Sequence, residues 1–248
     1  MDAVISDIHG NVEALDAVLD EIGRLRADRI ICLGDLVGYG PDSAECLRRS
    51  ADWDVLIAGD WECAVLDHDP GQWNPFLNRE IQRVSERIRT SPDSAHLLKL
   101  MRSFQRSHLQ DGWHFTHATP ADVREFLFPE DIYHTLKLER IATQFDIACV
   151  VGHTHYQCLF ERNETGHWTF VDAAANPSYE LLPHHKILVN AGSVGQPRDG
   201  DSRAAFLTID GATITFHRVE YDIRTTIAKI HSNPLIDNMH GDRLLVGR

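Results

Sequence analysis

The feature that most constrains the fold is a set of four short polar segments, each placed after an apolar run. They are Asp7-Ile-His9, Gly34-Asp35, His117 and Gly152-His153-Thr-His155. The apolar runs are typical of buried strands, and strand ends are where α/β sheets collect their functional side chains. Aspartate and histidine supply the oxygen and nitrogen donors that first-row divalent metals accept. The order of the segments predicts a fold that brings several strand ends together at a metal site.

The spacing within two of these segments supports the same interpretation. Residues i and i+2 of an extended segment point to the same side, so Asp7 with His9, and His153 with His155, are each expected to converge on one site. Taken singly, an Asp-x-His pair is equally well explained as ordinary structure, and a Gly-Asp turn or a lone histidine is better explained that way. The four segments together, in this order, favour the metal site.

The apolar pattern changes character along the chain. Up to residue 151 it alternates between strands and helices. The expected strands are 3–6, 28–33, 54–57, 113–116 and 147–151, and the expected helices are 11–25, a short one from 42, two within 75–107 separated at 91–93, and 129–145. Beyond residue 152 we expect mostly antiparallel strands, at 156–161, 168–172, 186–189, 204–209 and 213–219, and then a helix at 224–231.

This organisation predicts one domain of mixed α/β and α+β class, spanning residues 1–248 without a linker. Two sheets packed face to face with helices outside would accommodate both halves of the chain. An apolar content of 43% and a charged content of 25% are ordinary for a soluble protein with a full core. No apolar run approaches the roughly 20 residues of a membrane span, and the first residues lack the basic stretch of a secretory signal.

The cysteines indicate the expected cellular compartment, and the net charge indicates which classes of partner are expected. The five cysteines are scattered without Cys-x-x-Cys spacing, which favours reduced thiols and a cytoplasmic location. A formal net charge of −13 disfavours non-specific binding to nucleic acids or to anionic membranes. It is compatible with a small anionic substrate, because bound metal ions can reverse the sign of the potential inside a pocket.

The ordered segments resemble the motifs of the calcineurin-like metallophosphoesterase superfamily. Those motifs are Asp-x-His, Gly-Asp, Gly-Asn-His-Asp/Glu, a lone His and Gly-His-x-His. The stretches GDLVGYGPDSAEC (34–46), NAGSVGQPRDGDSRAAF (190–206) and HRVEYDI (217–223) are similar to its branch of small bacterial and archaeal phosphodiesterases. The resemblance covers essentially the whole chain. It implies a four-layer αββα sandwich with a dinuclear metal site at one edge of the sheets.

The resemblance also implies roles for individual residues. Two divalent transition metal ions, drawn from Mn, Fe, Ni and Zn, would be bound at the two halves of one site. Asp7, His9 and His155 would bind one ion, Asp60, His117 and His153 would bind the other, and Asp35 would bridge them and position the attacking hydroxide. The substrate would be a small phosphate ester, with nucleotides among the candidates.

Three further residues are candidate substrate contacts, each with a structural alternative. Asn11 is expected beside the site, or it simply begins the first helix. Tyr39 lines the substrate cleft or packs in the core, and Arg198 faces a phosphate or forms an exposed ion pair.

One segment departs from the family pattern. After the expected strand 54–57 the chain reads Gly59-Asp60-Trp61-Glu62, which we expect to be a loop. Asp60 stands where the pattern has a metal-binding Asn, and a carboxylate binds divalent metals at least as well as an amide. Trp61 stands where the pattern has the catalytic His, and an indole offers one N–H donor but no lone pair for proton transfer. Glu62, which would orient that His, is then left with nothing to orient.

Two hypotheses follow from this departure. The first is a metal-dependent phosphodiesterase whose activated hydroxide favours esters with good leaving groups, since losing a positioned acid typically costs about 10²–10⁴ in rate. The second is a catalytically impaired metal-binding pseudoenzyme that acts as a binding or scaffold protein. The retained set of ligands favours the first hypothesis, and Trp61 favours the second.

Overall fold

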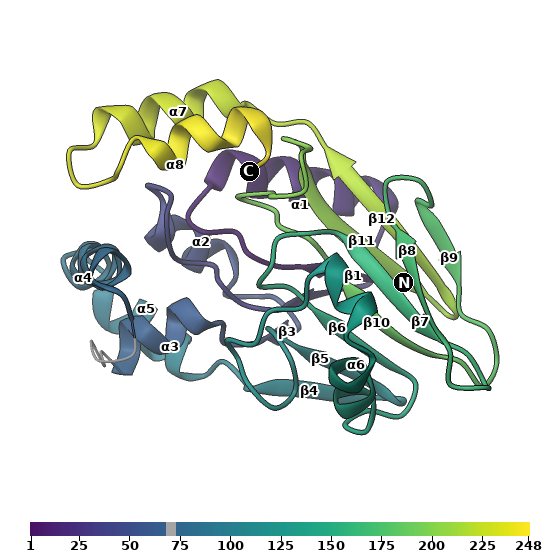
Figure 1. Ribbon diagram of the computed structural model, residues 1–248. Coiled ribbons are helices and arrows are strands. Elements are labelled where there is room, and N and C mark those ends of the chain that lie inside the picture. Colours follow the sequence, from purple (N-terminus) through teal and green to yellow (C-terminus); the bar gives the residue numbers. More distant parts are fainter. Residues whose placement is uncertain (68–72) are drawn as a thin grey trace.

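Two six-stranded sheets form the centre of the computed structural model, which describes residues 1–67 and 73–248 (Figure 1). The first sheet has the order β3 (Val55–Leu56), β2 (Arg29–Cys32), β1 (Asp2–Ile5), β11 (Ala204–Asp210), β12 (Thr213–Val219) and β9 (Ser178–Glu180). The second has the order β4 (Ser107–Gln110), β5 (Trp113–Thr116), β6 (Ala148–Val151), β10 (Lys186–Asn190), β7 (Cys158–Arg162) and β8 (Trp168–Asp172).

The pairing of the strands separates the two halves of the chain. Strands β1, β2 and β3 are parallel to one another, as are β5, β6 and β10. The later strands β7, β8, β9, β11 and β12 join their neighbours in antiparallel pairs. The parallel strands therefore end at a common edge of their sheet, and short loops after them can meet there.

The helices lie outside the sheets and complete four layers. They are α1 (Val12–Leu25), α2 (Ser43–Arg49), α3 (Asp60–Asp67), α4 (Pro75–Arg89), α5 (Ser94–Arg102), α6 (Thr135–Ala142), α7 (Ile223–Ser232) and α8 (Met239–Asp242). In Figure 1 the helices α1 and α2 lie beside the first sheet, α6 lies on the second, and α7 and α8 lie above α1. The sandwich that the sequence predicts is confirmed.

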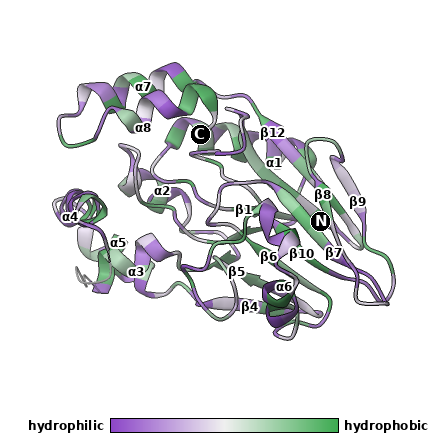
Figure 2. Cartoon of the chain, viewed as in Figure 1, coloured by the Kyte–Doolittle hydropathy of each residue, from purple (hydrophilic) through white to green (hydrophobic). Residues whose placement is uncertain are grey.

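Strands at the centre of the sandwich bury both faces. Along β1, Ala3 and Ile5 face the helices of the first layer, whereas Val4 faces the other sheet. Along β10, Leu188 packs against the α6 side while its neighbours pack between the sheets. This alternation explains why these strands are continuous apolar runs in the sequence, and why hydrophobic colour follows the strands in Figure 2.

Several elements differ from the prediction. The helix expected at 129–145 is interrupted, because His134 has the non-helical angles φ −109° and ψ 59° between the 3-10 helix η2 (Pro129–Tyr133) and α6. Residues 59–62 were expected as a loop, but α3 begins at Asp60, so that only Gly59 lies outside the helix. The strand expected at 156–161 begins only at Cys158. Strand β9 and the last helical segments, α8 and η3 (Arg243–Val246), were not predicted, because short elements carry little periodicity.

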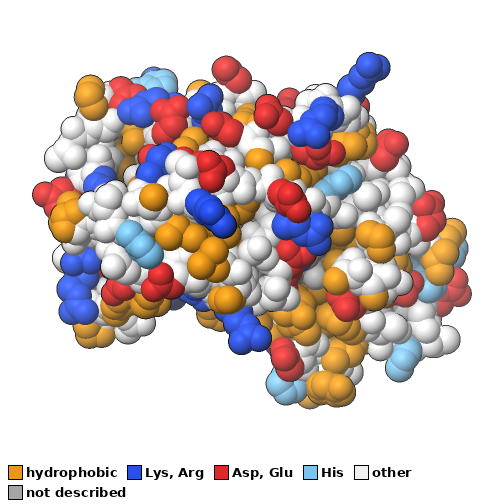
Figure 3. All heavy atoms as spheres, turned by 90° about the horizontal axis from the view of Figure 1, so that it is seen from above, with side chains coloured by type: hydrophobic (Ala, Val, Ile, Leu, Met, Phe, Trp, Pro, Cys, Tyr) orange, Lys and Arg blue, Asp and Glu red, His pale blue; other side chains and the backbone are white. Residues whose placement is uncertain are grey.

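Within residues 1–67 and 73–248, no helix is long and apolar enough to cross a bilayer. All five cysteines have free thiols. Figure 3, which views the molecule from the side of α7 and α8, shows acidic and basic side chains interspersed on that face.

Candidate metal centre

The polar segments that the sequence singles out meet between the two sheets. In the described part of the chain, two groups of buried side chains have ligand atoms within 4.8 Å of one another. Their elements are the loops after β1, β2, β5 and β6 and the first residue of α3, so both sheets contribute. One group is Asp7, His9 and His155, and the other is Asp35, Asp60, His117 and His153.

The backbone of these segments is not extended. Asp7, His9 and Asp35 have φ of 55°, 49° and 55°, and His153 and His155 have 67° and 61°. A non-glycine residue in this left-handed region costs of the order of 1 kcal/mol, so the surrounding structure must hold it there. The extended geometry assumed for the i, i+2 pairs is therefore wrong. Left-handed turns direct Asp7 and His9 to one group and divide His153 and His155 between the two.

The imidazoles of the first group are oriented by backbone carbonyls. His9 Nδ1 lies 3.0 Å from the carbonyl oxygen of Val37, and His155 Nδ1 lies 2.6 Å from that of Gln196. Because a carbonyl only accepts, each Nδ1 carries the hydrogen and each Nε2 presents a lone pair. These two Nε2 atoms face one another at 3.1 Å. Two facing lone pairs at this distance require a proton or a cation between them.

The second group has the same arrangement. His117 Nδ1 lies 3.0 Å from the carbonyl oxygen of Leu33, and His153 Nε2 lies 3.3 Å from that of Arg124. The opposite nitrogens, His117 Nε2 and His153 Nδ1, are 3.2 Å apart. Such outer hydrogen bonds fix the tautomer and direction of metal-binding histidines.

The carboxylates complete both groups. Asp35 Oδ2 is 3.6 Å from His9 Nε2 and 3.5 Å from His117 Nε2, so it lies between the two groups. Asp7 Oδ1 is 3.2 Å from His155 Nε2. Asp7 Oδ1 and Asp60 Oδ1 are buried without a hydrogen-bond partner in the described structure. Buried oxygens of this kind are costly unless a cation or a donor compensates them, so the donor set fits two metal ions.

The pKa values reflect the crowding of these groups. Burial and the charges of Asp60 and Glu62 hold the pKa of Asp35 well above its usual range. Burial also opposes ionisation of Asp60, but His117 and His153 outweigh it and lower the pKa of that carboxyl. Burial and the neighbouring His117 lower the pKa of His153 to about 4. Burial works against a charge on His117 as well, yet the Asp60 carboxylate, whose Oδ1 lies 3.5 Å from His117 Nε2, leaves its pKa raised.

Glu62 has a role that the sequence did not reveal. Its carboxylate is fully buried and accepts hydrogen bonds from the backbone N–H groups of Asp35 at 2.8 Å, Val37 at 3.2 Å and Gly59 at 2.8 Å. It ties the loop after β2 to the start of α3. The expectation that Glu62 has nothing to orient is wrong, because it orients backbone rather than a side chain. At residue 59 a Cβ would overlap Asp35 Oδ1, so glycine is required there.

Trp61 fills the space beside the first group. Its side chain is only 4% exposed. Its ring packs edge-on against Tyr39, with centroids 4.7 Å apart, and against His9 at 5.9 Å. Its backbone N–H donates to Asp35 Oδ1 at 3.0 Å. The backbone of residue 61 thus supports the centre whatever its side chain, while the indole closes one wall.

The three candidate substrate contacts lie in different settings. Tyr39 packs on His9 at 4.7 Å, and the Arg198 guanidinium lies 5.6 Å from the centre of the Tyr39 ring. Arg198 donates to Gln196 Oε1 at 2.7 Å, and its Nε is buried without a partner in the described structure. Asn11 instead caps α1 and bonds to the Gly195 carbonyl and to Thr226, so its amide is occupied within the protein.

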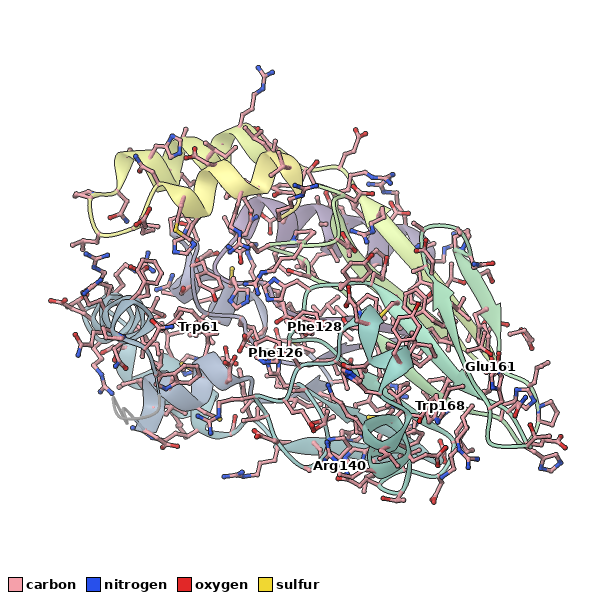
Figure 4. The ribbon with its side chains drawn as sticks, viewed as in Figure 1. Trp61, Phe126, Phe128, Arg140, Glu161 and Trp168 are labelled. Atoms are coloured by element: carbon pink, nitrogen blue, oxygen red, sulfur yellow. The ribbon has the colours of Figure 1, made fainter. Side chains whose placement is uncertain are left out.

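One pocket opens onto the two groups. It holds about 90 Å³. Its polar side includes Asp35, Asp60, His153 and Arg198, and its apolar side includes Trp61, Trp73 and Phe126. Figure 4 shows Trp61 on the side of α3 and α4, with Phe126 and Phe128 toward the strands. Phe126 and Trp73 could not be found from the sequence, because neither belongs to a motif.

We predict that Glu62→Gln destabilises the protein by about 2–3 kcal/mol, because one amide oxygen replaces two carboxylate oxygens that together accept three buried N–H groups. Urea unfolding measures this difference. The exposed Glu45, which pairs with Arg48 on α2, provides the control, and Glu45→Gln should change stability by about 0.5 kcal/mol or less. Equal effects of the two substitutions would contradict the structural role of Glu62.

Comparisons with known proteins agree with this geometry. The model of the calcineurin-like phosphoesterase superfamily domain matches residues 2–212. The protein MJ0912 of Methanocaldococcus jannaschii is 32% identical over 253 residues, which cover 100% of this chain and 98% of that protein. A metallophosphoesterase from Sphaerobacter thermophilus is similar in structure, with a TM-score of 0.82 and 27% identity over 100% of this chain and 99% of that one. The protein PH1004 of Pyrococcus horikoshii shares the fold, with a TM-score of 0.75 and 18% identity over 100% and 99% of the chains. The chain therefore belongs to the calcineurin-like phosphoesterase superfamily.

Proposed function

We propose that the protein is a metal-dependent phosphodiesterase with two divalent transition metal ions, drawn from Mn, Fe, Ni and Zn. One ion is bound by Asp7, His9 and His155, and the other by Asp60, His117 and His153, with Asp35 shared. The observation that carries the proposal is the position of Asp35 Oδ2, which is 3.6 Å from His9 Nε2 of one group and 3.5 Å from His117 Nε2 of the other. A shared carboxylate between two imidazole-lined groups is suited to a pair of cations.

Different residues of the pocket would have different roles in hydrolysis. Two bound cations would polarise the phosphoryl group and lower the pKa of water. Arg198 faces the same pocket and has an unpartnered buried N–H, so it would bind a phosphoryl oxygen through a charge-assisted hydrogen bond. Asp35, between the two groups, orients the attacking water. Tyr39 holds Arg198 in place through the contact of its ring with the guanidinium.

The leaving-group side of the pocket lacks a proton donor of the usual kind. Trp61 occupies it, and an indole N–H does not transfer its proton at neutral pH. We therefore propose a preference for small phosphodiesters with good leaving groups. The burial of Trp61 also suits the second hypothesis, a metal-binding pseudoenzyme. Hydrolysis of bis-p-nitrophenyl phosphate by the Mn²⁺-loaded protein separates the two, since only the enzyme turns it over.

We predict close to two metal ions per chain after reconstitution, measured by elemental analysis. Asp35→Asn should lower both occupancies, because Asp35 Oδ2 contacts both groups. Asp20→Asn on the exposed face of α1 is the matched control and should leave both unchanged. A single ion that is unaffected by Asp35→Asn would contradict the shared role of this carboxylate.

Metal affinity should fall as the pH is lowered from about 8 to about 6, because protons compete with metals for the same ligands. The pKa values of Asp35 and His117 are raised, so both groups hold their protons to a higher pH than usual. Lowering the pH therefore weakens metal binding at these two groups. Calorimetric titration with Mn²⁺ at the two pH values measures the change. An affinity that is constant over this range would contradict competition between protons and metal at Asp35 and His117.

Trp61→His should raise turnover of alkyl phosphodiesters by about tenfold to a hundredfold, the lower part of the general-acid range, and should change nitrophenyl esters much less. The gain is limited because the Glu62 carboxylate is already occupied by three backbone N–H groups and cannot orient the new imidazole. Trp61→Phe, which adds no donor, is the control. The smaller side chains leave a void that costs about 1–3 kcal/mol, less than truncation to Ala, so unfolding is measured in parallel. Equal rates for the His and Phe variants would show that a proton donor at residue 61 does not limit hydrolysis.

A further inference from the structure

The pocket has two chemically different walls, and the apolar one is not explained by metal or phosphate binding. The polar wall contains the candidate ligands and Arg198. The opposite wall is formed by Trp61 and Ala64 of α3, Leu77 and Ile81 of α4, Trp73 just before α4, and Phe126 from the loop that follows β5. A charged phosphoryl group gains nothing from contact with an apolar surface, whereas an organic ester group can bury its own apolar surface against it.

The mouth of the pocket carries aromatic surface that folding does not require. Phe126 and Phe128 are each 44% exposed, although both are large apolar side chains. Phe126 stacks on His153 with ring centroids 4.2 Å apart and on Phe128 at 5.3 Å, so its ring is held in position. Exposed apolar side chains concentrated beside a polar cleft are typical of ligand-binding surfaces.

The size of the pocket limits where an organic group can lie. An enclosed apolar cavity of roughly 150 Å³ is known to hold a benzene ring, whereas this pocket offers about 90 Å³ for the phosphoryl group and the group attached to it. A ring therefore lies across the open side, against Trp73 and the exposed part of Phe126. Phe126 stacks directly on His153, which is a candidate metal ligand. A substrate ring that contacts Phe126 must therefore be attached to the phosphoryl group directly or through one atom.

We propose that this apolar wall is a subsite for a planar aromatic ester group, so that the substrates are aryl phosphodiesters. The proposal rests on the phosphodiesterase function proposed above. In the reaction, the water oxygen gives up a proton to solvent and forms a bond to phosphorus, and the P–O bond to the aryl group breaks. The aryloxide leaves with the electron pair and takes its proton from solvent. Aryloxides depart without a protein acid far more readily than alkoxides, which agrees with Trp61 in place of an imidazole.

Binding of two phosphonates tests the subsite without any turnover. Phenylphosphonate and methylphosphonate share the head group and differ by the ring. Calorimetry with the Mn²⁺-loaded protein should show at least about tenfold tighter binding of phenylphosphonate, in line with burial of an aromatic ring. Phe126→Leu should reduce this ratio by about three- to tenfold, the value of one aromatic contact. Equal affinities for the two phosphonates would overturn the proposal.

Two controls test whether a change in the affinity ratio of the two phosphonates is due to the apolar wall. Tyr133→Leu removes an aromatic ring that is 84% exposed and does not line the pocket, so the ratio should not change. Because Phe126 also covers His153, metal content is measured for Phe126→Leu, and Trp73→Leu provides a second variant that stacks on no candidate ligand. A ratio that survives both Phe126→Leu and Trp73→Leu would also overturn the proposal.

Hydrolysis of two diesters separates this proposal from the proposed function. Methyl phenyl phosphate and methyl hexafluoroisopropyl phosphate have leaving groups of similar acidity, but only the first has a ring. We expect a kcat/KM at least about tenfold higher for the phenyl ester. Hydrolysis of both at equal rates would overturn the aromatic subsite and leave the phosphodiesterase standing. A phenylphosphonate preference without hydrolysis of either ester would support the subsite and contradict the phosphodiesterase.

Discussion

The burial of three carboxylates in one small space is the constraint on which the rest of the centre depends. Asp7, Asp35 and Asp60 are at most 6% exposed. A carboxylate removed from water costs several kcal/mol unless cations or donors compensate it. The imidazoles cannot supply all of that charge, because burial lowers the pKa of three of them, His9, His153 and His155. The chain thus folds around an excess of negative charge and a set of aligned lone pairs, which together call for bound cations.

The backbone holds this arrangement in place. Left-handed residues turn the chain sharply at the strand ends, so that short loops from both sheets can bring their side chains to one point. Glu62 stabilises the most crowded part by accepting N–H groups from two loops at once. Its presence after residue 61 is therefore explained by structure alone. An acid at this position of the motif does not indicate whether acid catalysis at residue 61 is retained.

Much of the fold and the positions of the candidate ligands could be predicted because both depend on local patterns. Apolar runs mark the buried strands, and the polar residues that follow mark the strand ends. The left-handed angles of Asp7 and His9 could not be predicted, since these residue types usually adopt other conformations. The contacts of Glu62 with Asp35 and Val37 and the stacking of Phe126 on His153 join residues 25–27 positions apart, and only the folded chain brings them together. The interruption at His134 lies within an amphipathic pattern that continues on both sides.

The replacement of an imidazole by an indole at residue 61 changes one side of the pocket and leaves the other intact. The backbone N–H of Trp61 still donates to Asp35, so the ligand geometry does not depend on the side chain at this position. The indole instead packs against Tyr39, which in turn lies beside Arg198, and it extends the apolar surface of α3 and α4 toward the centre. The polar half of the pocket, where a phosphoryl group would be bound, is therefore preserved. Under the proposed function, the consequences of an indole at residue 61 would fall on the departing group, whose chemistry would have to suit a wall that offers aromatic contact and no proton.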